Sequence, residues 1–130
     1  VVALALPNSA ESRGLMNEER LLKMKRGAIL LNVGRGNAVD TDALVRVLNS
    51  GRIKAGLDVT DPEPLLQGHP LWNCHGALIT PHISGYYHLK QTHDRIIEIA
   101  AANIRSLLDG KPILNAVDAE TGYRKPDNRF

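Results

Sequence analysis

The sequence has a single cysteine, Cys74, so no disulfide bond can form within the chain, which is what a reducing compartment favours. No apolar run approaches the roughly 20 residues that a membrane-spanning helix needs, and no signal peptide is visible. Sixteen basic residues against fourteen acidic ones give a formal net charge of +2 and form no long basic run. We therefore expect neither a membrane nor a nucleic acid as a partner.

The remaining composition is that of a globular domain. The chain has 130 residues, of which 43% are hydrophobic and 23% charged, enough for one domain of ordinary size. It opens inside the apolar run VVALAL, without a methionine or a polar lead-in. A domain rarely begins inside a buried strand, so we expect the chain to be part of a longer polypeptide. A shortened form of a small protein is the alternative.

Apolar runs alternate with amphipathic stretches along the chain. We expect strands at residues 1–6, 28–32, 53–59 and 77–80. The first of these runs is continuous, which is typical of a strand buried on both faces. We expect a helix between the Asn17 cap and Gly27, a second at residues 40–49 and a long one at about 86–109. This alternation predicts an α/β fold with a parallel sheet.

A glycine-rich turn, GRGNAV at residues 34–39, resembles a dinucleotide-binding fingerprint because it follows a strand and precedes a helix. The third glycine of that fingerprint allows close packing of helix on strand, and its place is taken by Val39. A β-branched residue there argues against a pyrophosphate site. We interpret the segment as a strand-to-helix turn in which glycine supplies a positive φ.

Ligands of open parallel sheets bind at the carboxyl ends of the strands. The loops that follow the four expected strands contain, among other residues, Ser12, Arg35, Glu63 and His82. Because such loops lie along one edge of a sheet, we expect Arg35, Glu63 and His82 to converge.

These three side chains suit chemistry on a 2-oxo or 2-hydroxy acid. The Arg35 guanidinium can bind a carboxylate through two parallel hydrogen bonds. The His82 imidazole can give or take the proton that accompanies hydride transfer near neutral pH. Glu63, between two prolines that stiffen its backbone, can orient the imidazole and favour its protonated form. Each residue alone could be an ordinary surface or structural residue, so the prediction depends on the three together.

The other histidines do not form a metal-binding pattern. They are His69, His75, His88 and His93. With one cysteine and neither an HExxH motif nor paired CxxC motifs, the sequence predicts no metal site.

Three ordered motifs resemble those of the D-isomer-specific 2-hydroxyacid dehydrogenases. Residues 32–44 resemble the family's N-x-x-R-G-x-x-V-D-x-x-A-L signature. Residues 56–65 look like its G-x-D-V-x-x-x-E-P-L segment, and residues 80–85 match T-P-H-x-[SG]-G. The opening LPNS at residues 6–9 fits the block that precedes them. The resemblance spans residues 1 to about 117.

The resemblance implies a Rossmann-like parallel sheet with flanking helices that is incomplete, being the second half of a dinucleotide-binding domain. Residues 1–117 would form this C-terminal part of an NAD(P)-binding domain, and residues 118–130 a polar tail. The implied reaction interconverts a D-2-hydroxy acid and a 2-oxo acid by hydride transfer with NAD or NADP. Arg35 would bind the substrate carboxylate, His82 would be the acid/base and Glu63 would pair with His82. The implied cofactor contacts are Leu6, Pro7, Ser12, Val33, Gly34, Arg35, Asp58, His82, Ile83, Ser84 and Gly85.

The family's G-x-G-x-x-G unit and substrate domain are missing from these residues. We therefore expect the 130-residue chain alone to be inactive. For the complete enzyme, we expect a cytoplasmic homodimer that acts on a small 2-oxo or 2-hydroxy acid. Two other classes remain open. One is a non-enzymatic NAD(H)-sensing scaffold or corepressor of the same fold. The other is an inactive fragment that associates with itself, because half a parallel sheet exposes a strand edge and apolar faces.

Overall fold

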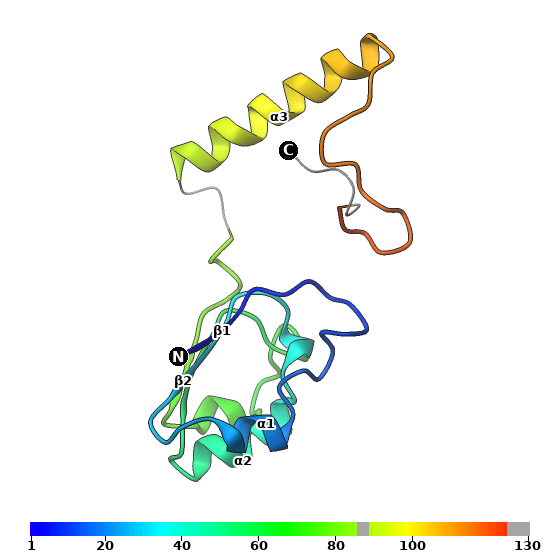
Figure 1. Cartoon of the computed structure of the whole chain (residues 1–130). Coiled ribbons are helices and arrows are strands. Elements are labelled where there is room, and N and C mark those ends of the chain that lie inside the picture. Colours follow the sequence, from blue (N-terminus) through cyan, green and yellow to red (C-terminus); the bar gives the residue numbers. More distant parts are fainter. Residues whose placement is uncertain (86–88, 125–130) are drawn as a thin grey trace. The chain divides into compact units, whose positions relative to one another are not determined.

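The structure is a computed structural model that describes residues 1–85 and 89–124, and the chain divides into two compact units. We call residues 1–85 the sheet unit and residues 86–130 the helix unit. The sheet unit holds four parallel strands in the order β1-β2-β3-β4. They are β1 (Val2–Leu4), β2 (Ile29–Asn32), β3 (Lys54–Leu57) and β4 (Ala77–Ile79). Figure 1 shows β1 beside β2 in this unit. The predicted α/β fold with a parallel sheet is confirmed.

Short helices connect successive strands of the sheet unit. They are α1 (Glu18–Lys23), the 3-10 helix η1 (Gly36–Ala38), α2 (Thr41–Asn49) and the 3-10 helix η2 (Pro70–Asn73). Asn17 caps α1 as expected, since its side chain accepts a hydrogen bond from the Arg20 amide at 3.0 Å. The expectation that Gly27 terminates this helix is wrong. The helix ends at Lys23 because Met24 is already extended, with ψ 144°, and Gly27 forms part of the following turn.

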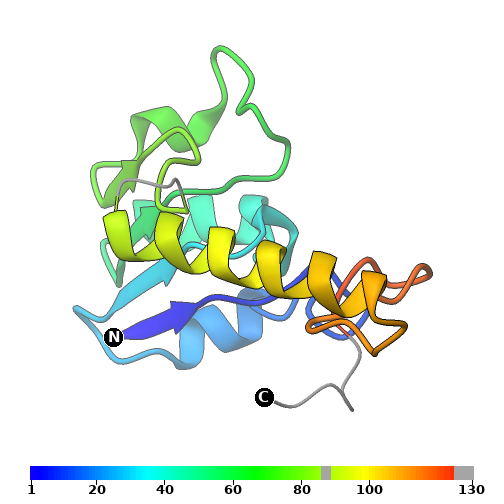
Figure 2. The same ribbon diagram turned by 90° about the horizontal axis from the view of Figure 1, so that it is seen from above.

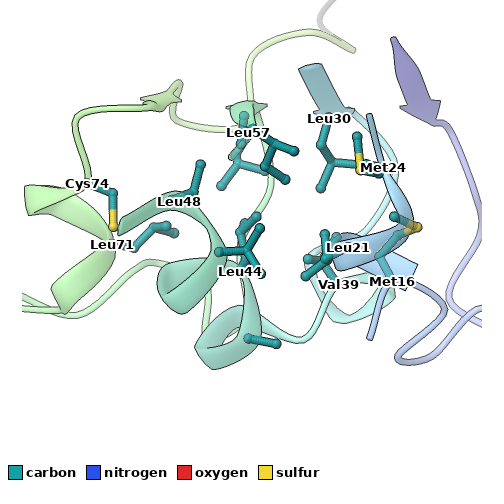
Figure 3. Packing of buried hydrophobic residues seen from close by; sticks show 14 of the residues in the cluster. Met16, Leu21, Met24, Leu30, Val39, Leu44, Leu48, Leu57, Leu71 and Cys74 are labelled. Atoms are coloured by element: carbon teal, nitrogen blue, oxygen red, sulfur yellow. The ribbon is translucent and has the colours of Figure 1, made fainter. Parts of the chain in front are cut away.

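A hydrophobic core lies between the sheet and these helices. Figure 3 shows Leu30 of β2 and Leu57 of β3 packed with Leu21 of α1 and Leu44 of α2. Leu71 of η2 completes the same cluster. Full burial of a leucine side chain contributes roughly 1.5–3 kcal/mol, so this one-sided core is the main source of stability of the sheet unit.

The opposite face of the sheet is apolar but open among the described residues. Leu31, Gly56 and Leu78 are register partners across β2, β3 and β4 on that face, and Leu78 is 70% exposed. The expectation that the first strand is buried on both faces is wrong, because only Leu4 of β1 is buried. An apolar run indicates two hydrophobic faces, but it cannot indicate whether a second layer covers both.

The helix unit is built around α3 (Lys90–Leu108), which Figure 2 shows as one continuous helix. The helix was expected from about residue 86, and residues 86–88 lie outside the described residues. None of its residues is buried, although it carries an apolar stripe that includes Ile97, Ile104 and Leu107. None of the helices in the described ranges is long and apolar enough to cross a membrane.

The segment after α3 is held by local hydrogen bonds. The Asn103 side chain donates to the Leu114 carbonyl at 3.0 Å and accepts from the Leu114 amide at 2.7 Å. Within the predicted tail, the Asp118 carboxylate accepts from the Glu120 and Thr121 amides at 2.9 and 3.0 Å. Residues 125–130 lie outside the described residues, and the domain boundary at residue 117 stays a prediction.

Candidate active site at the carboxyl ends of the strands

Glu63 and His82 are in contact at the carboxyl edge of the sheet. His82 Nδ1 lies 2.7 Å from Glu63 Oε1, and the two side chains are 48% and 36% exposed. Glu63 comes from the loop after β3 and His82 from the loop after β4. A carboxylate at Nδ1 favours the tautomer that carries a proton there, so Nε2 is left to exchange a proton with a ligand. An ion pair this exposed adds less than about 1 kcal/mol to stability.

The backbone at His82 is in the left-handed region, with φ 54°. This conformation is uncommon for a residue other than glycine. The His82 amide donates to the Asp58 carbonyl at 2.9 Å and to the Thr80 carbonyl at 3.0 Å. His82 is therefore held at its backbone by the end of β3 and at its ring by Glu63.

The Asp58 carboxylate is the hub of the loop after β4. Asp58 is 5% exposed, and its carboxylate accepts from the Ile83 amide at 2.9 Å, from the Ser84 amide and hydroxyl at 2.9 and 2.6 Å, and from the Thr80 hydroxyl. Burial by itself would raise the pKa of the Asp58 carboxyl. The hydrogen bonds from Ser84, Thr80 and the two amides outweigh burial and hold that pKa well below its usual range.

The Arg35 turn is built around a second buried polar residue, Asn32, at the end of β2. Asn32 is 1% exposed, donates to the Arg35 carbonyl at 2.9 Å and accepts from the Gly34 amide at 3.1 Å. The Arg35 side chain is exposed, and its Nη1 donates to the Gly34 carbonyl at 2.8 Å. The buried amide thus shapes the turn while the guanidinium remains accessible to a ligand.

The glycines of this turn serve close approach rather than a positive φ, so that part of the sequence interpretation is wrong. Neither Gly34 nor Gly36 is among the described glycines with positive φ. A Cβ on Gly34 would lie 2.5 Å from the Leu6 nitrogen, and one on Gly36 would lie 1.9 Å from the Thr60 carbonyl oxygen. The Arg35 turn is therefore packed directly against the loops after β1 and β3.

The structure supports the rejection of a pyrophosphate site at this turn. Val39 is buried and extended, with φ −118°, and α2 starts only at Thr41. The Asp40 carboxylate caps α2, accepting from the Ala43 amide at 2.9 Å. An anionic side chain thus occupies the helix N-terminus where a dinucleotide fingerprint would hold phosphate.

The residues predicted to contact a cofactor divide into accessible and enclosed ones. Pro7, Val33, Ile83, Ser84 and Gly85 are exposed and Leu6 is half-buried, whereas Ser12, Gly34 and Asp58 are buried. The Ser12 hydroxyl donates to the Pro7 carbonyl at 2.6 Å, so it braces the loop after β1. Contact of any of these residues with a cofactor stays a prediction.

Sequence reasoning missed Asn32 and Thr80 as parts of the site. Both are polar residues that directly follow apolar strand residues, and this position was the available signal. A polar side chain at the buried end of a strand needs partners, and the adjacent loop supplies them.

The accessible surface of this edge fits one end of a dinucleotide. The apolar side chains of Val33 and Ile83 are about half exposed, and each adjoins a loop that carries an exposed polar residue, Arg35 or His82. Such a mixture suits an aromatic ring together with an acid. The 130 residues contain no G-x-G-x-x-G turn, so they fit the nicotinamide end rather than the pyrophosphate. No group of three or more His, Cys, Asp or Glu side chains in the described part of the chain could hold a metal ion.

The parallel sheet and its polar carboxyl edge define part of a dinucleotide-binding α/β domain. The chain belongs to the D-isomer-specific 2-hydroxyacid dehydrogenase family, because residues 1–84 match the model of that family's NAD-binding domain. The expected family is thereby confirmed, together with a nicotinamide dinucleotide as its cofactor.

Relatives of known structure or name are considerably longer. One solved structure is a D-isomer-specific 2-hydroxyacid dehydrogenase from Xanthobacter autotrophicus Py2 in complex with NADPH and MES. Its sequence is 45% identical to this chain and the TM-score is 0.77. The match covers 94% of this chain and 49% of the dehydrogenase chain. The hydroxypyruvate reductase of Blautia hydrogenotrophica is 40% identical over 114 residues, which are 87% of this chain and 35% of the reductase. The human glyoxylate reductase/hydroxypyruvate reductase is 41% identical over 114 residues, which are 87% of this chain and 34% of the human protein. The chain spans about a third of the length of these two reductases.

Proposed function

We propose that this chain supplies the proton-transfer and carboxylate-binding residues of an NAD(P)-dependent D-2-hydroxyacid dehydrogenase. The observation that carries the proposal is the 2.7 Å contact between His82 Nδ1 and Glu63 on the same sheet edge as the exposed Arg35. Family membership supports it, because the matching model is the NAD-binding domain of the D-isomer-specific 2-hydroxyacid dehydrogenases.

The three residues divide the chemistry of 2-oxo acid reduction. Arg35 binds the substrate carboxylate and thereby orients the adjacent carbonyl. Protonated His82 gives its Nε2 proton to the carbonyl oxygen, and Glu63 at Nδ1 orients the ring for the transfer. A nicotinamide dinucleotide, when bound at this edge, would be the hydride donor for the carbonyl carbon. In the oxidative direction, neutral His82 takes the hydroxyl proton at Nε2.

The names of the relatives suggest which substrates to test first. Hydroxypyruvate and glyoxylate are the 2-oxo acids in the names of the Blautia and human reductases. We propose one of these small acids as the substrate of the complete enzyme. We also propose a cytoplasmic homodimer, since the lone Cys74 suits a reducing compartment and the exposed apolar stripe of α3 suits an association.

The test uses a chimera in which this chain replaces the segment that it matches in the Blautia hydroxypyruvate reductase. We expect the chimera to oxidise NADH or NADPH in the presence of a 2-oxo acid. His82→Ala should lower kcat by about 100-fold or more, since general acid catalysis contributes that much, and should leave cofactor affinity nearly unchanged.

The matched control is His75→Ala, because His75 is an exposed histidine that precedes β4 rather than following it. His75→Ala should leave kcat unaltered. An undiminished kcat in His82→Ala would contradict the acid/base role. A folded chimera that binds cofactor but reduces no 2-oxo acid would favour the NAD(H)-sensing scaffold.

A further inference from the structure

Asp58, the residue that directly follows β3, makes most of the described hydrogen bonds of the loop after β4. The Asp58 carbonyl accepts from the His82 amide, and Asp58 Oδ1 accepts from the Ile83 amide and the Thr80 hydroxyl. Asp58 Oδ2 accepts from the amide and the hydroxyl of Ser84. Asp58 therefore binds the residues on both sides of His82 as well as His82 itself.

The backbone of His82 requires such a restraint. Its φ of 54° is disfavoured for a side chain with a Cβ, and such residues persist only where their surroundings determine them. Glu63 contacts the ring but not the backbone, and both of these side chains are more than a third exposed. The exposed Glu63 contact can orient the His82 ring. The buried contacts of Asp58 fix the backbone position from which the His82 side chain extends.

The hydrogen-bonding pattern explains why a carboxylate stands at this position. Each Asp58 oxygen accepts two hydrogen bonds, and all four partners are donors. An asparagine has one acceptor oxygen, so its Nδ2 would face donors at the second position. Hydrogen bonds to an ionised acceptor are also roughly twice as strong as neutral ones. Both oxygens are thus engaged within the chain.

We propose that Asp58 is a positioning residue that fixes the conformation of residues 80–84 and so sets His82 against Glu63. It acts on the reaction through His82. The cofactor contact expected for Asp58 from the sequence stays a separate prediction. The part of the proposal that concerns catalysis rests on the proposed function, whereas the part that concerns the loop does not.

The positioning role can be tested by NMR, comparing the 130-residue chain with its Asp58→Asn variant. We expect amide exchange at Ile83 and Ser84 to accelerate about 10-fold or more, because local opening of the loop becomes easier. We expect the Nδ1 proton signal of His82 to be lost or shifted, while exchange at the core amide of Leu44 stays unchanged. Asp61→Asn is the matched control, since the Asp61 side chain is exposed and only three residues away.

Thr80→Val is a second variant for the case that Asp58→Asn fails to fold, because it is nearly isosteric and removes one of the four donors. It should accelerate exchange at Ile83 by a smaller factor. Unaltered exchange at Ile83 and Ser84 and an unaltered His82 signal, in whichever of the two variants folds, would overturn the proposal.

The chimera distinguishes failure of this proposal from failure of the proposed function. There Asp58→Asn should lower kcat by about 100-fold, the loss typical of a displaced reacting group. A loss of cofactor affinity with an unaltered kcat would indicate a cofactor contact alone and overturn the positioning role. If His82→Ala leaves kcat unaltered while Asp58→Asn still loosens the loop, the function fails and the structural role of Asp58 stands.

Discussion

Two loops carry the proposed catalytic residues, and different forces hold them. The Arg35 turn is held by close packing, because its flanking glycines lie so near the Leu6 and Thr60 backbones that no Cβ fits. The His82 loop is held by charge, through the four hydrogen bonds to the Asp58 carboxylate, and a Cβ on Gly85 would meet no atom within 4 Å. The first loop should therefore be sensitive to an added carbon and the second to a lost charge.

The largest effect on stability is expected for Gly36→Ala. Its Cβ would lie 1.9 Å from the Thr60 carbonyl oxygen, which is backbone and cannot rotate away. We expect the free energy of unfolding to fall by about 3 kcal/mol or more, measured by urea denaturation. Gly85→Ala, its counterpart in the His82 loop, should change it by less than about 0.5 kcal/mol. Equal losses in the free energy of unfolding for the two variants would contradict the claim that the Arg35 turn is packed more closely than the His82 loop.

Asp58→Asn should come second, with a loss of about 1–3 kcal/mol at pH 7 from weakened buried hydrogen bonds. The pKa of Asp58 is lowered in the folded chain, so its charge stabilises the fold above the unfolded-state pKa of about 4. This stabilisation is lost as the pH falls toward the folded-state pKa. The difference between the variant and the unaltered chain should thus narrow below about pH 4. Urea denaturation of both chains at pH 7, 5 and 3 would measure this difference in the free energy of unfolding. A difference that stays constant over this range would contradict a stabilising role of the Asp58 charge.

Asn32→Ala tests the neutral counterpart of Asp58. It leaves the Gly34 amide and the Arg35 carbonyl without their buried partner, so we expect a loss of about 1–2 kcal/mol. Because an amide does not titrate, the loss should be the same at pH 7 and pH 3. A loss that depends on pH in the manner of Asp58→Asn would mean that the two loops are held in the same way.

Local patterns predicted the elements of the fold well. The expected strands lie within one or two residues of β1 to β4 at each end, and Asn17 caps α1 as expected. These features depend on neighbouring residues and on the alternation of apolar positions, which a sequence displays directly. Exposed apolar faces were expected of half a sheet, but that the open face is the one with Leu31 and Leu78 was not predictable, because it depends on which layers cover the sheet.

Interactions between distant segments were harder to predict, and the contact of Glu63 with His82 is the exception. The contact of Glu63 with His82 was expected from the family resemblance and is present, although its catalytic role stays a prediction. The close approach of Gly36 to Thr60 joins two loops whose sequences give no sign of each other. The hydrogen bonds of Asp58 to residues 80–84 were not predicted, because a motif shows that a carboxylate is present but not what it binds. Its expected contact with the cofactor stays a prediction.

We propose that the two loops divide the chemistry, with Arg35 binding the substrate carboxylate and His82 transferring the proton. The most direct test is steady-state kinetics of 2-oxo acid reduction by the chimera with Arg35→Ala and His82→Ala in parallel. We predict that Arg35→Ala greatly raises KM for the 2-oxo acid and also lowers kcat, whereas His82→Ala lowers kcat with KM nearly kept. An unaltered KM in Arg35→Ala, or an unaltered kcat in His82→Ala, would contradict the account.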